Sequence, residues 1–173
     1  TTAGCNSFYR THNGQLQQFK GGSFEKVQRP KGVLLLEDVK RSGSPIAKNI
    51  SSTLWDIGDG VACLEFTSKM NSLNPFILLM IDKAVRELPG RGFKAMVIHN
   101  DGTNFSVGAN IALLLYGAKL RLWPFVRWVL KRGQNSFQKM RFAPFPVIGA
   151  PSGMALGGGC EVLLHCDAIE AHA

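Results

Sequence analysis

The chain has 173 residues, 45% of them hydrophobic, and a formal net charge of +8. This length and composition are typical of a globular protein with a real core and argue against a disordered chain. Four cysteines without a CxxC pair or a histidine at zinc spacing argue against a disulfide framework and a metal site, so we expect reduced thiols and a cytoplasmic protein.

The first 50 residues are polar and interrupted by glycine and proline. Asn13–Gly14 lies between two short runs and predicts a hairpin turn. A short apolar piece, residues 33–39, is flanked by segments that read as linker. We therefore predict that residues 1–50 form an extended arm or linker.

A denser pattern begins near Ser51. Residues 52–68 contain two strand-like runs around Gly58, Asp59 and Gly60, which predicts a second hairpin. Residues 74–88 predict a helix, with Asn74 as its N-cap and Pro75 at its first position.

The rest of the chain alternates between strands and helices. We predict strands at 93–100, 144–151 and 167–173, helices at 111–122, 124–141 and 160–166, and loops at 101–110 and 152–159. This alternation indicates an α/β fold with crossover connections. Ligands of such folds bind beyond the carboxyl ends of the strands, where both glycine-bearing loops are expected.

The uncharged stretch from Phe142 to Gly159 is long enough to suggest a membrane span. It contains Pro144, Pro146, Pro151 and five glycines, which no single spanning helix would tolerate. We therefore expect no membrane span.

Positive charge is concentrated between Asp101 and Glu161, where no acidic residue occurs. The basic residues of this interval are Lys119, Arg121, Arg127, Lys131, Arg132, Lys139 and Arg141. A solvated helix face, an anionic or phosphate-bearing ligand and an acidic partner all remain open as explanations. Nucleic acid is disfavoured, because no zinc-finger, helix-turn-helix or RNP-like motif accompanies the charge.

Two loops carry small residues where the next helix begins, residues 105–111 (FSVGANI) and 154–161 (MALGGGCE). Backbone N–H groups at a helix start are unpaired, and two of them aimed at one point would form an oxyanion hole. Tight packing of glycines is the alternative explanation for either loop alone. The GGG run lacks the residues of a P-loop or a dinucleotide fingerprint.

The segments NFSVGANI, VIGAPSGMALGGGCE and HCDAIEAHA together resemble the crotonase (enoyl-CoA hydratase/isomerase) superfamily, from about Ser51 to Ala173. The resemblance implies the ClpP/crotonase spiral of β-β-α units, incomplete here. Residues 1–50, with their SFYR start, resemble the linker after the dehydrogenase part of bacterial fused 3-hydroxyacyl-CoA dehydrogenase/enoyl-CoA hydratases. The chain would then be a fragment that lacks an upstream dehydrogenase domain.

The resemblance also implies roles for individual residues. Ala109 and Gly158 would donate their N–H groups to the thioester carbonyl, and Glu161 would be one of two carboxylates that activate water. The second carboxylate would follow Ala173. Asn110 stands where the family usually has Asp. The residues expected to contact acyl-CoA are Met70, Asn71, Gly108, Asn110, Ile111, Ala112 and Gly157.

These roles imply hydration of 2-enoyl-CoA thioesters in fatty-acid β-oxidation. An isomerase, another acyl-CoA enzyme of this fold and a non-catalytic acyl-CoA-binding module are the alternatives. We expect acyl-CoA as substrate and no cofactor in this segment, with NAD bound only by the missing dehydrogenase domain. That domain is the expected partner, and homo-oligomerisation is left open.

Overall fold

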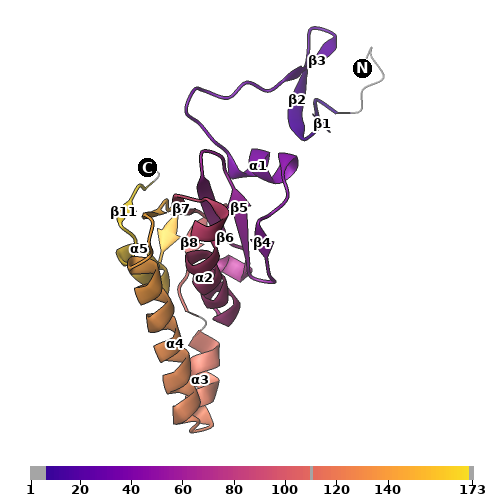
Figure 1. Cartoon of the computed structure of the whole chain (residues 1–173). Helices are drawn as coiled ribbons and strands as arrows, with labels where there is room; N and C mark the ends of the chain where they lie inside the picture. Colours follow the sequence, from indigo (N-terminus) through magenta and orange to yellow (C-terminus); the bar gives the residue numbers. More distant parts are fainter. Residues whose placement is uncertain (1–6, 110, 172–173) are drawn as a thin grey trace. The chain divides into compact units, whose positions relative to one another are not determined.

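The computed structural model describes residues 7–109 and 111–171. The chain divides into two compact units, Thr1–Pro45 and Ile46–Ala173 (Figure 1). We expected the boundary at residue 50. The structure places it earlier because strand β4 (Ala47–Lys48) pairs with strand β5 (Ser52–Asp56) and so belongs to the second unit.

The first unit contains regular structure where we expected an extended arm. A three-stranded antiparallel sheet is followed by one helix; these elements are β1 (Tyr9–His12), β2 (Gln15–Lys20), β3 (Ser23–Lys26) and α1 (Leu36–Ser42). The predicted hairpin turn is confirmed, since Asn13 and Gly14 both have positive φ between the paired residues His12 and Gln15.

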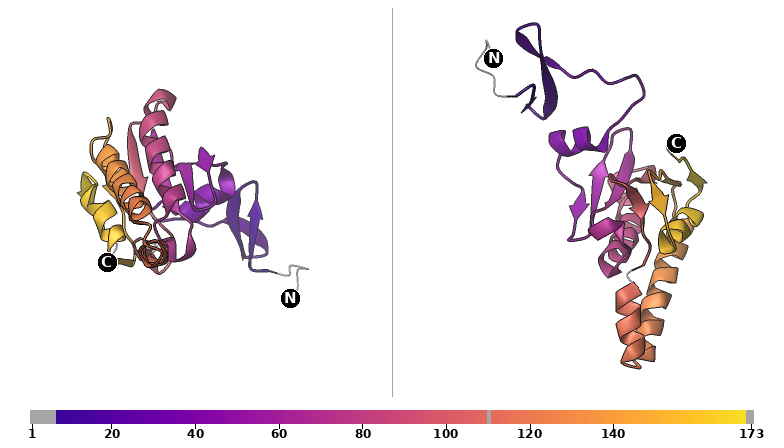
Figure 2. Two further views of the ribbon diagram at one scale, coloured as in Figure 1. Left: turned by 90° about the horizontal axis from the view of Figure 1, so that it is seen from below. Right: turned by 180° about the vertical axis from the view of Figure 1, so that it is seen from behind.

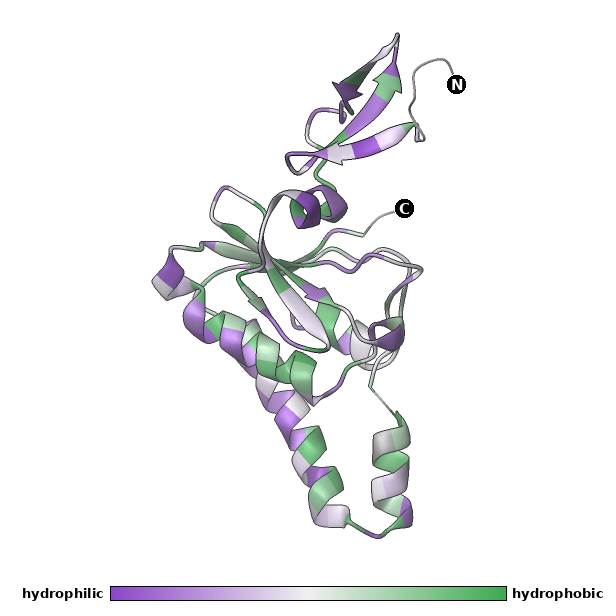
Figure 3. Cartoon of the chain, turned by 90° about the vertical axis from the view of Figure 1, so that its right-hand side faces the viewer, coloured by the Kyte–Doolittle hydropathy of each residue, from purple (hydrophilic) through white to green (hydrophobic). Residues whose placement is uncertain are grey.

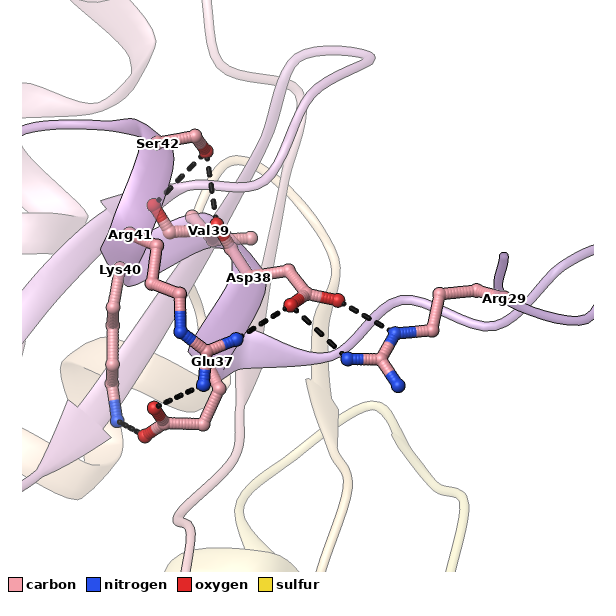
Figure 4. Close-up of polar contacts among 7 residues, drawn as sticks. All are labelled: Arg29, Glu37, Asp38, Val39, Lys40, Arg41 and Ser42. Carbon is pink, nitrogen blue, oxygen red and sulfur yellow. Dashed lines mark hydrogen bonds and ion pairs between the residues drawn. The ribbon is translucent and has the colours of Figure 1, made fainter. Parts of the chain in front are cut away.

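Polar contacts tie helix α1 to the residues before it (Figure 4). The Asp38 carboxylate accepts hydrogen bonds from Arg29 Nε at 2.9 Å and from Arg41 Nη1 at 2.8 Å. The bond from Arg29 is the main cause that lowers the pKa of Asp38. Ser42 Oγ donates to the Asp38 carbonyl at 3.0 Å and closes the last turn.

The second unit is built on a mixed six-stranded sheet, in agreement with the predicted α/β class. Its strand order is β11-β9-β7-β6-β5-β4, with antiparallel pairing at the β4–β5–β6 end and parallel pairing elsewhere. The further strands are β6 (Val61–Phe66), β7 (Ala95–Ile98), β9 (Val147–Gly149) and β11 (Ala168–Ile169). The predicted hairpin at residues 58–60 joins β5 to β6.

A separate two-stranded parallel sheet lies inside the segments that we predicted as loops. It pairs β8 (Asn104–Ser106) with β10 (Met154–Ala155). Strands of two or three residues are too short to show a sequence period, which is why the loop prediction was wrong here.

The helices follow the predicted order. They are α2 (Pro75–Glu87), α3 (Ile111–Lys119), α4 (Trp123–Arg141) and α5 (Gly158–Leu164), with 3-10 turns η1 (Lys69–Asn71) and η2 (Pro89–Arg91). The N-cap prediction is confirmed: Asn74 Oδ1 accepts from Phe76 N at 2.9 Å and Ile77 N at 3.3 Å. Helices α3 and α4 run side by side as a hairpin (Figure 1), and Figure 2 shows them from two further sides.

The core of the second unit lies between the sheet and helices α2, α4 and α5. It includes the fully buried side chains Leu64, Ile81, Met96, Phe105, Met140 and Val162. Hydrophilic and hydrophobic residues alternate along α4 (Figure 3), as expected of a helix with one packed face. No helix in the described part of the chain is long and apolar enough to cross a membrane.

A buried carboxylate joins α2 to α4. Asp82, only 8% exposed, accepts hydrogen bonds from Arg132 Nη2 at 2.9 Å and from Lys139 Nζ at 3.2 Å. Two of the basic residues that suggested an anionic ligand are therefore paired within the fold.

Removing the charge of Asp82 should destabilise this unit. For Asp82→Asn we expect a loss of about 1–3 kcal/mol in unfolding free energy, since both hydrogen bonds involve charged donors. The control is Glu87→Gln on the same helix, whose more exposed ion pairs should contribute less than about 1 kcal/mol. Urea unfolding of both variants measures the difference, and equal midpoints would contradict this role for Asp82.

Candidate active site

The loop after β8 and the loop after β10 lie against each other, because the two strands pair in parallel. Their closest approach is at Gly108, whose φ is +84°. A Cβ at this position would lie 2.5 Å from the Leu156 carbonyl oxygen and 2.8 Å from Gly158 N. Glycine is therefore required here both by backbone conformation and by space.

The start of α5 packs equally closely on β8. A Cβ at Gly159 would lie 2.6 Å from the carbonyl oxygen of Ser106 and 2.8 Å from its Cβ. Gly157 meets no neighbouring atom but has a φ of +50°, which side chains disfavour. Two of the three consecutive glycines therefore serve different needs, a close approach and a turn.

Ser106 fastens the loop that carries Gly108. Its hydroxyl donates to the Asn71 carbonyl at 2.7 Å and accepts from Gly108 N at 3.1 Å. Its carbonyl accepts from Leu156 N at 2.8 Å, which links the second loop to the first. Sequence reasoning missed this residue, because nothing distinguishes a buried serine from a loop serine in the letters alone.

The fully buried side-chain amide of Asn100 holds β8 in place. Asn100 Oδ1 accepts from Phe66 N and Asn100 Nδ2 donates to the Phe105 carbonyl, both at 2.6 Å. This side chain therefore links β6 to β8, which belong to different sheets. Sequence reasoning missed it as well.

Within the described part of the chain, two residues that line one cavity, Ala109 and Gly158, have unpaired backbone N–H groups. Leu73 N donates to the Gly108 carbonyl at 2.8 Å, which fixes the backbone just before Ala109. The Cβ position of Gly158 lies 3.3 Å from Ala109 N. Among the described residues, the N–H groups of Ala109 and Gly158 have no hydrogen-bond acceptor. Adjacent, unpaired donors of this kind can bind an oxyanion.

The cavity has a volume of about 140 Å³ and is mostly apolar. The residues that line it are Leu73, Asn74, Pro75, Leu78, Ala109, Leu114, Val129, Leu130, Gly133, Gln134, Phe137, Gly158 and Glu161. The three residues predicted as catalytic, Ala109, Gly158 and Glu161, thus share one cavity wall. Within the described residues no ion pair or hydrogen bond engages the Glu161 carboxylate, so it is available to a ligand.

The other predicted contact residues lie outside this cavity. Met70 and Asn71 form part of η1, and the Asn71 side chain donates to the Asn104 carbonyl at 2.9 Å. Ile111 and Ala112 are exposed at the start of α3. Gly108 and Gly157 shape the loops beside the cavity, and Asn110 lies outside the described residues.

Cavity residues from α3 and α4 were missed by sequence reasoning. Val129, Leu130, Gly133, Gln134 and Phe137 recur at helical spacing on one face of α4. That spacing is visible in the sequence, but it predicts only a packed face and cannot distinguish a core contact from a cavity wall.

Among the described residues, the thiols of Cys160 and Cys166 are free. Burial, together with the charge of Asp167, raises the pKa of Cys166 to about 12, so its thiol stays protonated at neutral pH. In the described part of the chain, no three His, Cys, Asp or Glu side chains are grouped to hold a metal ion.

Comparison with known proteins identifies the family. The family model described as enoyl-CoA hydratase/isomerase matches residues 56–172. A protein named as a probable 3-hydroxyacyl-CoA dehydrogenase, from Bacillus subtilis (strain 168), is 38% identical over 97% of this chain and 21% of its own length. A protein provisionally named fatty acid oxidation complex trifunctional enzyme, from Rickettsia prowazekii (strain Madrid E), is 35% identical over 61% of this chain and 15% of its own length.

Solved structures support the fold. A crystal structure of an enoyl-CoA hydratase from Bacillus anthracis superposes with a TM-score of 0.62 at 22% identity, over 70% of this chain and 47% of that chain. The chain therefore has the crotonase fold in part, spanning about half of the solved structure and about a fifth or less of these two relatives. With the family model covering most of its length, the chain belongs to the enoyl-CoA hydratase/isomerase family.

Proposed function

We propose that this chain contributes the oxyanion-binding loops and one catalytic carboxylate to the hydration of a 2-enoyl-CoA thioester in fatty-acid β-oxidation. The observation that carries the proposal is the shared cavity of Ala109, Gly158 and Glu161. Two free N–H groups and a free carboxylate are among the groups that this reaction needs.

The first step is binding of the thioester carbonyl oxygen by the N–H groups of Ala109 and Gly158. Addition of water at C3 moves the double-bond electrons towards that oxygen, so negative charge develops there. Donors held in place stabilise this charge without reorganising during the reaction. The close packing at Gly108 and Gly159 would hold them.

Glu161 would act on the attacking water. In the proposed step its carboxylate takes one proton from water while the oxygen bonds to C3, and the resulting enolate takes a proton at C2 from the second carboxyl group. Return of the proton from Glu161 to that group restores both for the next turnover. By the family resemblance, the second carboxylate would follow Ala173. The Asn110 position, where the family usually has Asp, would leave the backbone contacts of the loop unchanged.

An isomerase is the second candidate. Glu161 is the one carboxylate among the described residues that line the cavity. A single carboxylate suffices to move a proton between C2 and C4 of a 3-enoyl-CoA, whereas hydration divides base and acid work between two groups.

The wider context of the proposal is a multifunctional enzyme. The 38% identity to a longer protein named as a dehydrogenase supports a 3-hydroxyacyl-CoA dehydrogenase domain, with its NAD, elsewhere in the same polypeptide. Exposed Met70, Ile111 and Ala112 would contact the CoA part of the substrate, outside the cavity. The free thiols of Cys160 and Cys166 fit a cytoplasmic enzyme.

The test uses the natural full-length protein that carries this chain. We expect it to convert 2-butenoyl-CoA to 3-hydroxybutanoyl-CoA, followed by mass spectrometry with ¹⁸O-labelled water. Shift of a 3-enoyl-CoA double bond without ¹⁸O uptake would favour the isomerase, and binding of acyl-CoA without any turnover would favour a non-catalytic module.

A further inference from the structure

Gly133 lies in the middle of helix α4, on the wall of the cavity. Glycine destabilises a helix interior relative to alanine, so its presence there calls for a reason. A Cβ at this position would meet only Leu78 Cδ1, at 3.9 Å, which is ordinary contact. Neither crowding nor a positive φ requires glycine at this position.

A second helical glycine, Gly117 in α3, provides the contrast. A Cβ there would lie 2.9 Å from Val126 Cγ2 and 3.4 Å from Phe125 Cδ1. Gly117 is therefore needed for α3 to pack on α4. Gly133 has no such packing role. The space that a side chain at 133 would occupy is part of the cavity.

The cavity beside Gly133 suits a hydrocarbon. Leu78, Leu114, Val129, Leu130 and Phe137 supply apolar walls. Its volume of about 140 Å³ is close to that of a dry protein cavity of about 150 Å³ that accepts a six-carbon ring. Glu161 lines the same cavity, so the hydrocarbon tail of a ligand whose reacting carbons lie at this carboxylate would contact the apolar walls directly.

We propose that Gly133 sets the length of the acyl tail that the site accepts. The inference rests on the proposed function, because it takes the thioester to lie at Ala109, Gly158 and Glu161. The tail beyond the reacting carbons then runs between α2 and α4, through the space that a side chain at 133 would fill. Any larger residue there shortens the accepted tail.

The experiment compares Gly133→Leu and Gly133→Ala with the unchanged natural full-length protein, on 2-enoyl-CoA substrates of four to ten carbons. Each methylene that leaves an apolar pocket weakens binding about fourfold, so two displaced methylenes cost about fifteenfold. For Gly133→Leu we expect kcat/KM for the ten-carbon substrate to fall about fifteenfold or more, mainly through KM. The four-carbon substrate should change less than about threefold, and Gly133→Ala should be intermediate.

Asn135→Leu is the matched control, because Asn135 is exposed on the same helix and does not line the cavity. An equal loss at all chain lengths, or the same profile in Gly133→Leu and Asn135→Leu, would overturn the proposal.

Calorimetric binding of saturated acyl-CoA of four to ten carbons separates this inference from the proposed function. In one outcome no substrate turns over, but the affinity for acyl-CoA rises with tail length and Gly133→Leu removes that rise. The proposed function then fails, and the role of Gly133 stands. If turnover occurs and the rise is unaffected by Gly133→Leu, only the role of Gly133 fails.

Discussion

Replacing Glu161 by glutamine in the natural full-length protein is expected to lower kcat for hydration by about 10²–10⁴-fold. Glutamine keeps the size of the side chain but cannot take a proton from water. Glu161 lies in the first turn of α5 and lines the cavity, and its backbone N–H, which the substitution does not alter, donates to the Gly157 carbonyl at 3.1 Å. The fold and the N–H groups of Ala109 and Gly158, which we propose to bind the oxyanion, should therefore be unchanged.

Binding of a saturated acyl-CoA should survive this substitution, measured by calorimetry on the same preparation. Glu170→Gln is the control, because it makes the same chemical change at an exposed carboxylate outside the cavity. Turnover that is equal in the Glu161→Gln and Glu170→Gln variants would remove Glu161 from the mechanism.

The second large effect is expected at Gly108. In Gly108→Ala the new Cβ would overlap the Leu156 carbonyl and Gly158 N, so the two loops must separate. Separation would move the N–H groups of Ala109 and Gly158 apart, so that they could no longer bind one oxygen as proposed. Loss of one such donor lowers kcat by about 10²–10³-fold, and we expect a loss of this size.

Gly102→Ala provides the control for backbone strain. Gly102 also has a positive φ, of +125°, but a Cβ there meets no atom within 4 Å. A small effect at Gly102 beside a large one at Gly108 would assign the loss to loop separation. Similar losses in both variants would instead indicate strain alone.

The elements that the sequence predicts well are those with a local cause. The helix start is marked by Asn74, whose side chain caps the first turn, and by Pro75, whose φ is fixed. The glycines around Asp59 mark a hairpin because they adopt positive φ. Strands β8 and β10 were missed, since their pairing depends on residues about fifty positions apart. The three-stranded sheet of the first unit was missed because its strands are largely exposed and polar.

The candidate site divides in the same way. The glycines at 108, 157 and 159 are visible in the sequences of the two loops, and Glu161 follows the second loop directly. Ser106 and Asn100 act through partners that are distant in the sequence, Asn71 and Phe66, and carry no local signal. The α4 wall has a visible helical period, but its facing partner, Leu78, is set only by tertiary packing.

The ion pairs of Asp82 restrict the movement of α4, the helix that forms one wall of the cavity. The two partners of this carboxylate, Arg132 and Lys139, flank Gly133 along α4 and are about two turns apart. Anchors at two heights on one helix oppose both rotation about its axis and sliding along it. Movement of α4 would therefore do little to make room for a bulkier side chain at 133, and under our proposal the site would accept only a shorter tail.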